Sequence, residues 1–194
     1  MDSLLQTIQF ASEAHKNQRR KDPYGTPYIN HPIAVANYIA TIGRVSDVVV
    51  LQAAILHDVV EDVKEYSIND ITNIFGSQVS SIVSEVTDDK SLSKLERKKL
   101  QVENAPKKSI GAKLVKLADK LHNCSDLLIN PPESWSTEYI KGYFVWSWYV
   151  VNGLRGTNEY LENALDDVFS KIIKDEMENK EKMSVLLAEY YSMC

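Results

Sequence analysis

The chain of 194 residues is 44% hydrophobic and 25% charged, a size and composition that predict one globular domain with its own core and exclude a disordered or fibrous protein. Its formal net charge of −5 argues against a nucleic-acid partner, because such binding depends on basic surfaces that neutralise phosphates. No apolar run approaches the roughly 20 residues of a membrane helix, and no secretory leader opens the chain, so we expect a cytoplasmic protein without a membrane partner.

Apolar residues recur at helical spacing through almost the whole chain, and no stretch shows the alternation and turn signals of a sheet, so we predict an all-α fold. An amphipathic helix opens the chain near residues 4–11. A loop rich in turn formers follows at 22–27, and Pro32 suits the first turn of a second helix, where its missing N–H costs nothing. His31 therefore stands at the mouth of that helix.

Residues 46–63 are apolar nearly all round as far as His57, which is typical of a central buried helix. Ser67 or Asn69 can cap the next helix, and Gly76 can end it. Later helices are predicted over residues 78–86, 112–128, 136–154 and 158–175. We assign residues 1–175 to one domain and residues 176–194 to a C-terminal helical extension of unknown role, which packs on the domain or on a partner.

Four ionisable side chains lie close together at the end of the 46–63 helix: His57, Asp58, Glu61 and Asp62. On a continuous helix His57 is one turn from Glu61, and Asp58 is one turn from Asp62, so all four share one broad face. Three carboxylates buried together require protonation or large pKa shifts unless a cation joins them. A divalent metal resolves this conflict. The alternative, a solvated helix end, is less favoured because the histidine follows directly on apolar residues.

Further ligands must come from elsewhere in the chain. His31, at its helix mouth, can point into a cleft, and Asp119 interrupts an apolar helical pattern as a carboxylate ligand would. Asp119 can instead pair with Lys116 or Lys120, and the sequence leaves this open. His15 is expected at the surface or behind the ligands.

Three motifs occur in order along the chain. Residues 27–32 read Pro-Tyr-Ile-Asn-His-Pro, residues 57–62 read His-Asp-Val-Val-Glu-Asp, and residues 117–123 read Leu-Ala-Asp-Lys-Leu-His-Asn. Through them the chain resembles the HD-domain hydrolases of the RelA/SpoT group over about residues 5–169. The resemblance is nearest to the small, hydrolase-only metazoan members, which the Thr-Asp-Asp-Lys sequence at 87–90 supports. Several ordered motifs are far more specific than an isolated His-Asp pair.

The resemblance implies a single-domain HD fold with one metal ion, typically Mn²⁺. Its four implied ligands are His31, His57, Asp58 and Asp119. Two histidines and two carboxylates leave positions for water and substrate, and the hard oxygen donors agree with Mn²⁺. Glu61 and Asp62 are implied to be the catalytic carboxylates, which orient water and move protons. His122 is expected behind the ligands.

The family's substrate is guanosine 3′,5′-bis(diphosphate), from which the 3′-pyrophosphate is removed. The residues implied to bind it are Arg20, Lys21, Lys94, Arg97, Asn123 and Tyr143. Arg20 is implied to stack on guanine, Lys21 to meet phosphate and Asn123 to hold the ribose. For the basic residues, the alternative is a solvated surface.

A chain of 194 residues leaves no room for the synthetic and regulatory domains of the large relatives, so we expect it to degrade this nucleotide and never to make it. One alternative is removal of the 2′-phosphate of NADPH, to which the metazoan subgroup has been linked. Another is a nucleotide-binding module without catalysis. Glu61 and Asp62 argue against a pure binder, because added negative charge beside phosphates weakens binding. The oligomeric state is left open.

Overall fold

The computed structural model describes residues 2–194, and within that range every regular element is a helix; a single isolated bridge pairs Arg19 with Pro27. The helices in chain order are α1 (Asp2–Ala14), α2 (Asn30–Thr41), α3 (Val48–Leu56), α4 (Val59–Asp62), α5 (Ile68–Phe75), α6 (Ser77–Val86), α7 (Lys94–Asn104), the 3₁₀ helix η1 (Ala105–Lys107), α8 (Ile110–Ile129), α9 (Thr137–Asn152), α10 (Glu159–Met177) and α11 (Lys180–Ser192). The predicted all-α fold is confirmed.

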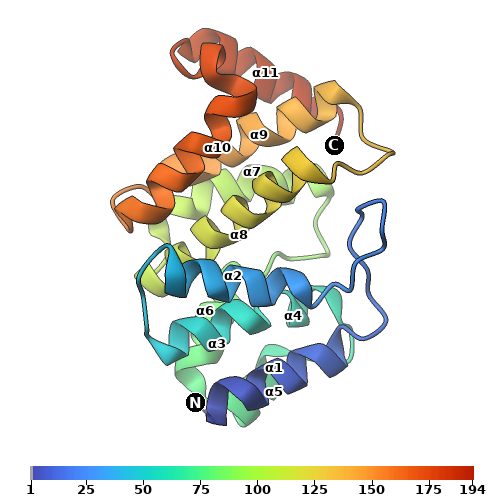
Figure 1. Ribbon diagram of the computed structural model, residues 1–194, viewed down its shortest axis with the longest axis vertical. Helices are drawn as coiled ribbons and strands as arrows, with labels where there is room; N and C mark the ends of the chain where they lie inside the picture. Colours follow the sequence, from blue (N-terminus) through green and yellow to red (C-terminus); the bar gives the residue numbers. More distant parts are fainter. Residues whose placement is uncertain (1) are drawn as a thin grey trace.

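The helices are arranged around α2 and α8, which cross the middle of the molecule (Figure 1). Helices α1, α3 and α5 lie toward one end, and α9, α10 and α11 lie toward the other. The central helix α8 packs against α2, α3, α6, α9 and α10, and Leu117, Ala118 and Cys124 on it are fully buried. Burying apolar side chains on all these contacts supplies the main stabilisation of the fold.

Side-chain caps define the helix boundaries. Of the two candidate caps for α5, Ser67 is used: it accepts a hydrogen bond from the Asp70 backbone, and the Asp70 side chain accepts one in return from the Ser67 backbone. Gly76 ends α5 with φ of +87°, a conformation that glycine adopts without strain. The predicted stop at this glycine is confirmed.

The prediction of one continuous helix over 46–63 is wrong. Helix α3 ends at Leu56, and the short helix α4 begins only at Val59. At the break, Nδ1 of His57 donates to the carbonyl oxygen of Ala54 at 2.8 Å, which satisfies a carbonyl near the helix end. Asp58 takes φ −101° and ψ −5°. The break directs His57 and Asp58 differently from the helix-face arrangement that the sequence suggested.

The C-terminal tail packs on its own chain. Helix α11 lies against α9, and its Met183 and Tyr190 are buried. Figure 1 shows the C-terminus beside α9, on the same side of the molecule as the loop between α8 and α9. None of the helices in the described range is long and apolar enough to span a bilayer.

Candidate active site

Three side chains from separate elements converge in the core. His31 lies in the first turn of α2, His57 directly follows α3, and Asp119 lies within α8. All three are buried, and their donor atoms lie within 4.8 Å of one another. Nε2 of His31 lies 3.2 Å from Oδ1 of Asp119, and Nε2 of His57 lies 3.8 Å from the same oxygen. This is a donor set suited to a divalent cation.

Asp58 borders the same histidine nitrogens. Its Oδ2 lies 3.0 Å from Nε2 of His57 and 3.6 Å from Nε2 of His31. The hydroxyl of Tyr28 donates to this oxygen at 2.6 Å. A carboxylate held by a neighbouring donor in this way has a fixed direction, as metal ligands generally do.

The His57 ring fits a metal ligand. Because the Ala54 carbonyl can only accept, the proton of a neutral His57 ring is on Nδ1, and the Nε2 lone pair faces the cluster. Nε2 is buried and makes no hydrogen bond, although Asp58 is close. A buried polar atom without a hydrogen bond is costly. A cation between Nε2 and the carboxylates removes that cost, so these residues fit the metal that the fold family implies.

His122 lies behind His31. The two Nδ1 atoms are 2.9 Å apart, so one ring donates and the other accepts. Burial and the charge of His31 lower the pKa of His122 to about 4, which keeps it neutral and able to accept. The Nε2 of His31 is then free to face Asp119.

The charges in the cluster balance one another. Without a cation, burial would lower the pKa of His57, but Asp58 and Asp119 outweigh it and raise the pKa to about 10, so a cation that binds Nε2 takes the place of a proton there. Burial alone would raise the pKa of Asp119, but Lys120 and the two histidines hold it well below its usual range. The carboxylates therefore require positive charge beside them, which a divalent cation also provides.

Asp119 makes the alternative ion pair with Lys120 and also faces the histidines. Its Oδ2 pairs with Nζ of Lys120 at 2.9 Å, while its Oδ1 faces the histidines. The amide of Asn123 also donates to Oδ1, at 2.6 Å. Among the described residues Lys116 makes no ion pair with Asp119. The Lys120 pair thus holds the carboxylate in place and leaves one oxygen for the cluster.

Glu61 and Asp62 follow the cluster on α4. Glu61 accepts the backbone N–H of Asp88 at 3.1 Å, and Nζ of Lys90 lies 3.4 Å from Glu61 and 2.9 Å from Asp62. Burial, together with the charges of Asp88 and Asp58, raises the pKa of Glu61. A carboxyl group with a raised pKa is better suited to take up and release a proton near neutral pH.

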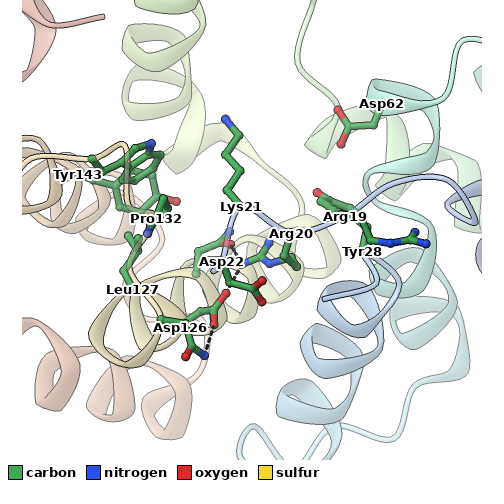
Figure 2. Close-up of a pocket in the computed structure, with 13 residues that line it drawn as sticks. Arg19, Arg20, Lys21, Asp22, Tyr28, Asp62, Asp126, Leu127, Pro132 and Tyr143 are labelled. Atoms are coloured by element: carbon green, nitrogen blue, oxygen red, sulfur yellow. Dashed lines mark hydrogen bonds and ion pairs between the residues drawn. The ribbon is translucent and has the colours of Figure 1, made fainter. Parts of the chain in front are cut away.

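A pocket of about 340 Å³ opens beside these residues. Four of the residues implied to bind substrate line it: Arg20, Lys21, Asn123 and Tyr143. Figure 2 shows Asp62 and Tyr28 on one side of the pocket and Tyr143 on the other, with Lys21 between them. Tyr28 and Asn123 belong both to the pocket wall and to the surroundings of the cluster, because each bonds one of its carboxylates.

Arg20 is anchored rather than solvated. Its Nη2 donates to Oδ1 of Asn123 at 3.0 Å and pairs with Oδ2 of Asp126 at 2.8 Å. Its guanidinium carbon lies 5.9 Å from the centre of the Tyr28 ring. These contacts fix the plane of the guanidinium, which can then present a flat face to a ligand. The alternative of a solvated basic run is wrong for this residue.

The sequence profile of the HD domain matches residues 7–139, which is more than half of the chain. The chain belongs to the HD-domain family. The chain is 55% identical over 168 residues to the guanosine-3′,5′-bis(diphosphate) 3′-pyrophosphohydrolase MESH1 of Homo sapiens, with 87% of this chain and 93% of that protein covered. The MESH1 protein of Drosophila melanogaster is 52% identical over 166 residues, with 86% and 92% covered.

Among solved structures, a metazoan ortholog of SpoT that hydrolyzes ppGpp aligns with a TM-score of 0.86 and 50% identity, over 88% of this chain and 96% of that chain. The protein lmo0812 of Listeria monocytogenes aligns with a TM-score of 0.61 and 28% identity, over 74% and 99%. The resemblance to the RelA/SpoT group and the helical single-domain HD fold are thereby confirmed.

Lys94 and Arg97 lie in different surroundings. Lys94 lines a second cavity next to the pocket, whereas Arg97 lies 3.8 Å from Glu61 and lines a different cavity with Asp88. The two residues therefore line separate cavities. His15, expected at the surface or behind the ligands, is buried and bonds the side chain of Gln18.

Several residues at the site were not predicted. No helical periodicity or charge pattern marks Tyr28 as a site residue, although it lies within the motif at 27–32. Asp126 was detectable, because Asp119, Asn123 and Asp126 recur at helical spacing on one face of α8. Trp135 lies in the loop before α9 and reaches the pocket only through the tertiary fold.

Proposed function

We propose that this HD domain is a metal-dependent guanosine-3′,5′-bis(diphosphate) 3′-pyrophosphohydrolase, which converts its substrate and water into GDP and pyrophosphate. Asn123 carries the proposal, because it donates to the candidate ligand Asp119 and accepts from Arg20 in the pocket. One residue thereby connects the pocket with the candidate metal cluster, which supports the proposal. The relatives named as guanosine-3′,5′-bis(diphosphate) 3′-pyrophosphohydrolases support this choice.

The metal is proposed to be a single Mn²⁺, held by His31, His57, Asp58 and Asp119. When bound, it supplies Lewis acidity that lowers the pKa of water and screens the negative charge of the phosphate. The buried, unbonded Nε2 of His57 and the converging carboxylates support this ligand set.

Glu61 and Asp62 are proposed to handle the proton. Water attacks the phosphorus attached to the 3′ oxygen, the bond between them breaks, and the 3′ oxygen leaves as a hydroxyl. The attacking water must lose a proton and the leaving oxygen must gain one, which a positioned carboxyl pair can mediate. Lys90 holds Asp62 at 2.9 Å, and the raised pKa of Glu61 favours proton uptake there.

The nucleoside is proposed to lie in the 340 Å³ pocket. The fixed guanidinium plane of Arg20 supports stacking of guanine, and Asn123 supports a contact with the ribose. Lys21 and Tyr143 line the same space and are proposed to complete it. We also propose that the protein is located in the cytoplasm, where such a nucleotide is dissolved.

Steady-state kinetics on the purified protein with Mn²⁺ tests this function. We expect the kcat/KM for guanosine 3′,5′-bis(diphosphate) to exceed that for NADPH, whose 2′-phosphate is the other candidate group for this site. Release of pyrophosphate from the first substrate and of phosphate from the second separates the two reactions. A larger kcat/KM for NADPH would contradict the proposal and make NADPH the preferred substrate.

A further inference from the structure

The loop of residues 87–93, between α6 and α7, begins with the Thr-Asp-Asp-Lys sequence. The backbone N–H of Asp88 donates to Oε2 of Glu61 at 3.1 Å. Two residues later, Nζ of Lys90 lies 2.9 Å from Oδ1 of Asp62. This short sequence therefore contacts both of the candidate catalytic carboxylates on α4.

Helix α7 holds the loop through Gln101. The side chain of Gln101 bonds Oδ2 of Asp88 at 2.6 Å, and because a carboxylate only accepts, the amide N–H of Gln101 is the donor. The side chain of Asp88 is thus tied to α7, while its backbone N–H is tied to Glu61. Two hydrogen bonds that meet in one residue therefore connect α7 with Glu61.

Gln101 makes this contact at a cost to stability. Within residues 2–194, its Oε1 is buried and has no hydrogen-bond partner. An unsatisfied buried acceptor costs about 1–3 kcal/mol, and an apolar side chain of the same shape avoids that cost. Packing alone therefore does not account for a glutamine at this position, whereas the bond to Asp88 does.

Helix α7 also reaches Glu61 directly. Arg97 precedes Gln101 by one turn, and its Nη1 lies 3.8 Å from Oε1 of Glu61. Nζ of Lys90 lies 3.4 Å from the same oxygen. The Asp88 N–H holds one oxygen of Glu61 while two cations face the other. Contacts on both sides of a carboxylate restrict its rotation, as the positioning of a catalytic group requires.

Helix α7 is itself well anchored. At its start, Ser93 accepts a hydrogen bond from the Glu96 backbone, and the Glu96 side chain accepts one in return from the Ser93 backbone. In its middle, the indole N–H of Trp146 on α9 donates to the backbone carbonyl of Lys98 at 3.0 Å. The helix that carries Gln101 therefore has a fixed place relative to the rest of the core.

Resting on the proposed function, we propose that Asp88 and Gln101 are positioning residues, which hold the carboxylate of Glu61 where it takes up and releases the proton during hydrolysis. Both residues lie outside the lining of the nucleotide pocket and outside the proposed set of metal ligands. The bond between them should therefore affect the rate of the chemical step and not the binding of nucleotide or metal.

Gln101→Leu tests this inference, because it removes the bond and nearly keeps the size of the side chain. Misplacement of a catalytic group by about 1 Å can cost about 100-fold in rate, so we expect kcat for guanosine 3′,5′-bis(diphosphate) to fall about tenfold or more. KM and the affinity for Mn²⁺ should not change. Gln78→Leu, at an exposed position of α6, is the matched control and should leave all three values unchanged. An unchanged kcat in Gln101→Leu would overturn the inference.

Two substitutions of Asp88 separate its position from its charge. Asparagine keeps a side-chain oxygen that accepts from Gln101, and alanine does not. We expect Asp88→Ala to lower kcat as Gln101→Leu does, and Asp88→Asn to lose less. Adding Gln101→Leu to Asp88→Ala should cause no further loss, because residues that act through one shared bond are not additive. Losses that multiply in the double variant would contradict a shared role.

Hydrogen exchange separates this inference from the proposed activity. The exchange rate of the Asp88 backbone amide is followed by NMR in the metal-free protein. Its bond to Glu61 should slow exchange, Gln101→Leu and Glu61→Ala should accelerate it, and Gln78→Leu should not. This pattern in a protein that hydrolyses no guanosine 3′,5′-bis(diphosphate) would overturn the proposed function alone. A rate for Asp88 that Gln101→Leu leaves unchanged would overturn the inference.

Discussion

Asn123 donates its side-chain amide to Oδ1 of Asp119 at 2.6 Å. The two residues lie one turn apart on α8, so a rigid helix connects the wall of the nucleotide pocket with the metal cluster. The same Asn123 accepts from Arg20. In the proposed function, binding of the nucleoside and positioning of the candidate ligand Asp119 therefore depend on one side chain.

Replacing Asn123 by alanine should weaken both functions. Without the amide, Asp119 loses a donor that directs it, and loss of such a contact typically costs about 10- to 100-fold in metal affinity or activity. We expect a lower Mn²⁺ affinity in calorimetric titration together with a higher KM. Asn152→Ala, at the far end of α9, is the control. Unchanged Mn²⁺ affinity in Asn123→Ala would show that Asp119 does not depend on this bond.

Replacing the candidate ligand Asp119 by alanine should abolish metal binding. The change removes the oxygen that both histidines face and leaves Lys120 without its partner. Metal content measured by mass spectrometry after dialysis against Mn²⁺ should fall to background, while circular dichroism reports whether the helices persist. A folded variant that keeps stoichiometric Mn²⁺ would remove Asp119 from the ligand set.

Neutralising Glu61 and Asp62 together, as Glu61→Gln with Asp62→Asn, should eliminate turnover but keep the metal. Loss of general acid–base catalysis costs about 10²- to 10⁴-fold in kcat, whereas neither residue belongs to the proposed ligand set. Turnover and Mn²⁺ content are measured on the same sample. The control is Glu65→Gln, which removes a negative charge at an exposed position just after α4. Survival of hydrolysis in the double variant would contradict the assigned roles.

Gly142→Ala should destabilise the packing of α11 on α9. The added Cβ would approach three atoms of the Tyr190 side chain at 2.7 to 3.0 Å, and overpacking of this kind costs about 1–3 kcal/mol. Thermal unfolding should show a lower Tm. In a Tyr190→Gly background the same substitution should cost almost nothing, because glycine has none of the three atoms that the added Cβ would meet. An equal decrease in Tm in both backgrounds would show that the strain does not come from the contact with Tyr190.

The two cysteines should differ in reactivity. Burial raises the pKa of the fully buried Cys124 thiol to about 12, so at pH 8 almost none of it is thiolate, the form that reacts. Raising the pH should accelerate its alkylation about tenfold per pH unit throughout the range below that pKa, because the thiolate fraction rises in that proportion. Cys194, which is partly exposed, should be labelled first by iodoacetamide in a time course read by mass spectrometry. Equal rates at pH 8 would contradict the burial of Cys124.

The types of residue at the metal cluster follow from the sequence, because a histidine and carboxylates at the end of an apolar segment require a compensating charge. Their geometry does not. The helix break at His57 depends on the bond from its side chain to the Ala54 carbonyl, which competes with continued helix and leaves no periodic signal. A pattern of apolar residues records which side is buried and not where a helix is interrupted.

The pocket was predictable only in part for a similar reason. Arg20 and Lys21 are adjacent in the chain and reach the same pocket, but Trp135 arrives there from a distant loop. Lys94 and Arg97 lie three residues apart on α7 and nevertheless face different cavities. The boundary between those cavities is set by side chains of other helices. The spacing of residues along α7 gives no information about those side chains.

Titration of the EDTA-treated protein with Mn²⁺, followed by the release of pyrophosphate from guanosine 3′,5′-bis(diphosphate), tests the central claim most directly. Activity should be absent without metal, rise with added Mn²⁺ and saturate at one ion per chain, since the cluster provides a single set of ligands. His57→Ala should show no rise over the same range. Full activity in excess EDTA, or saturation only at two ions per chain, would contradict a mononuclear metal-dependent hydrolase.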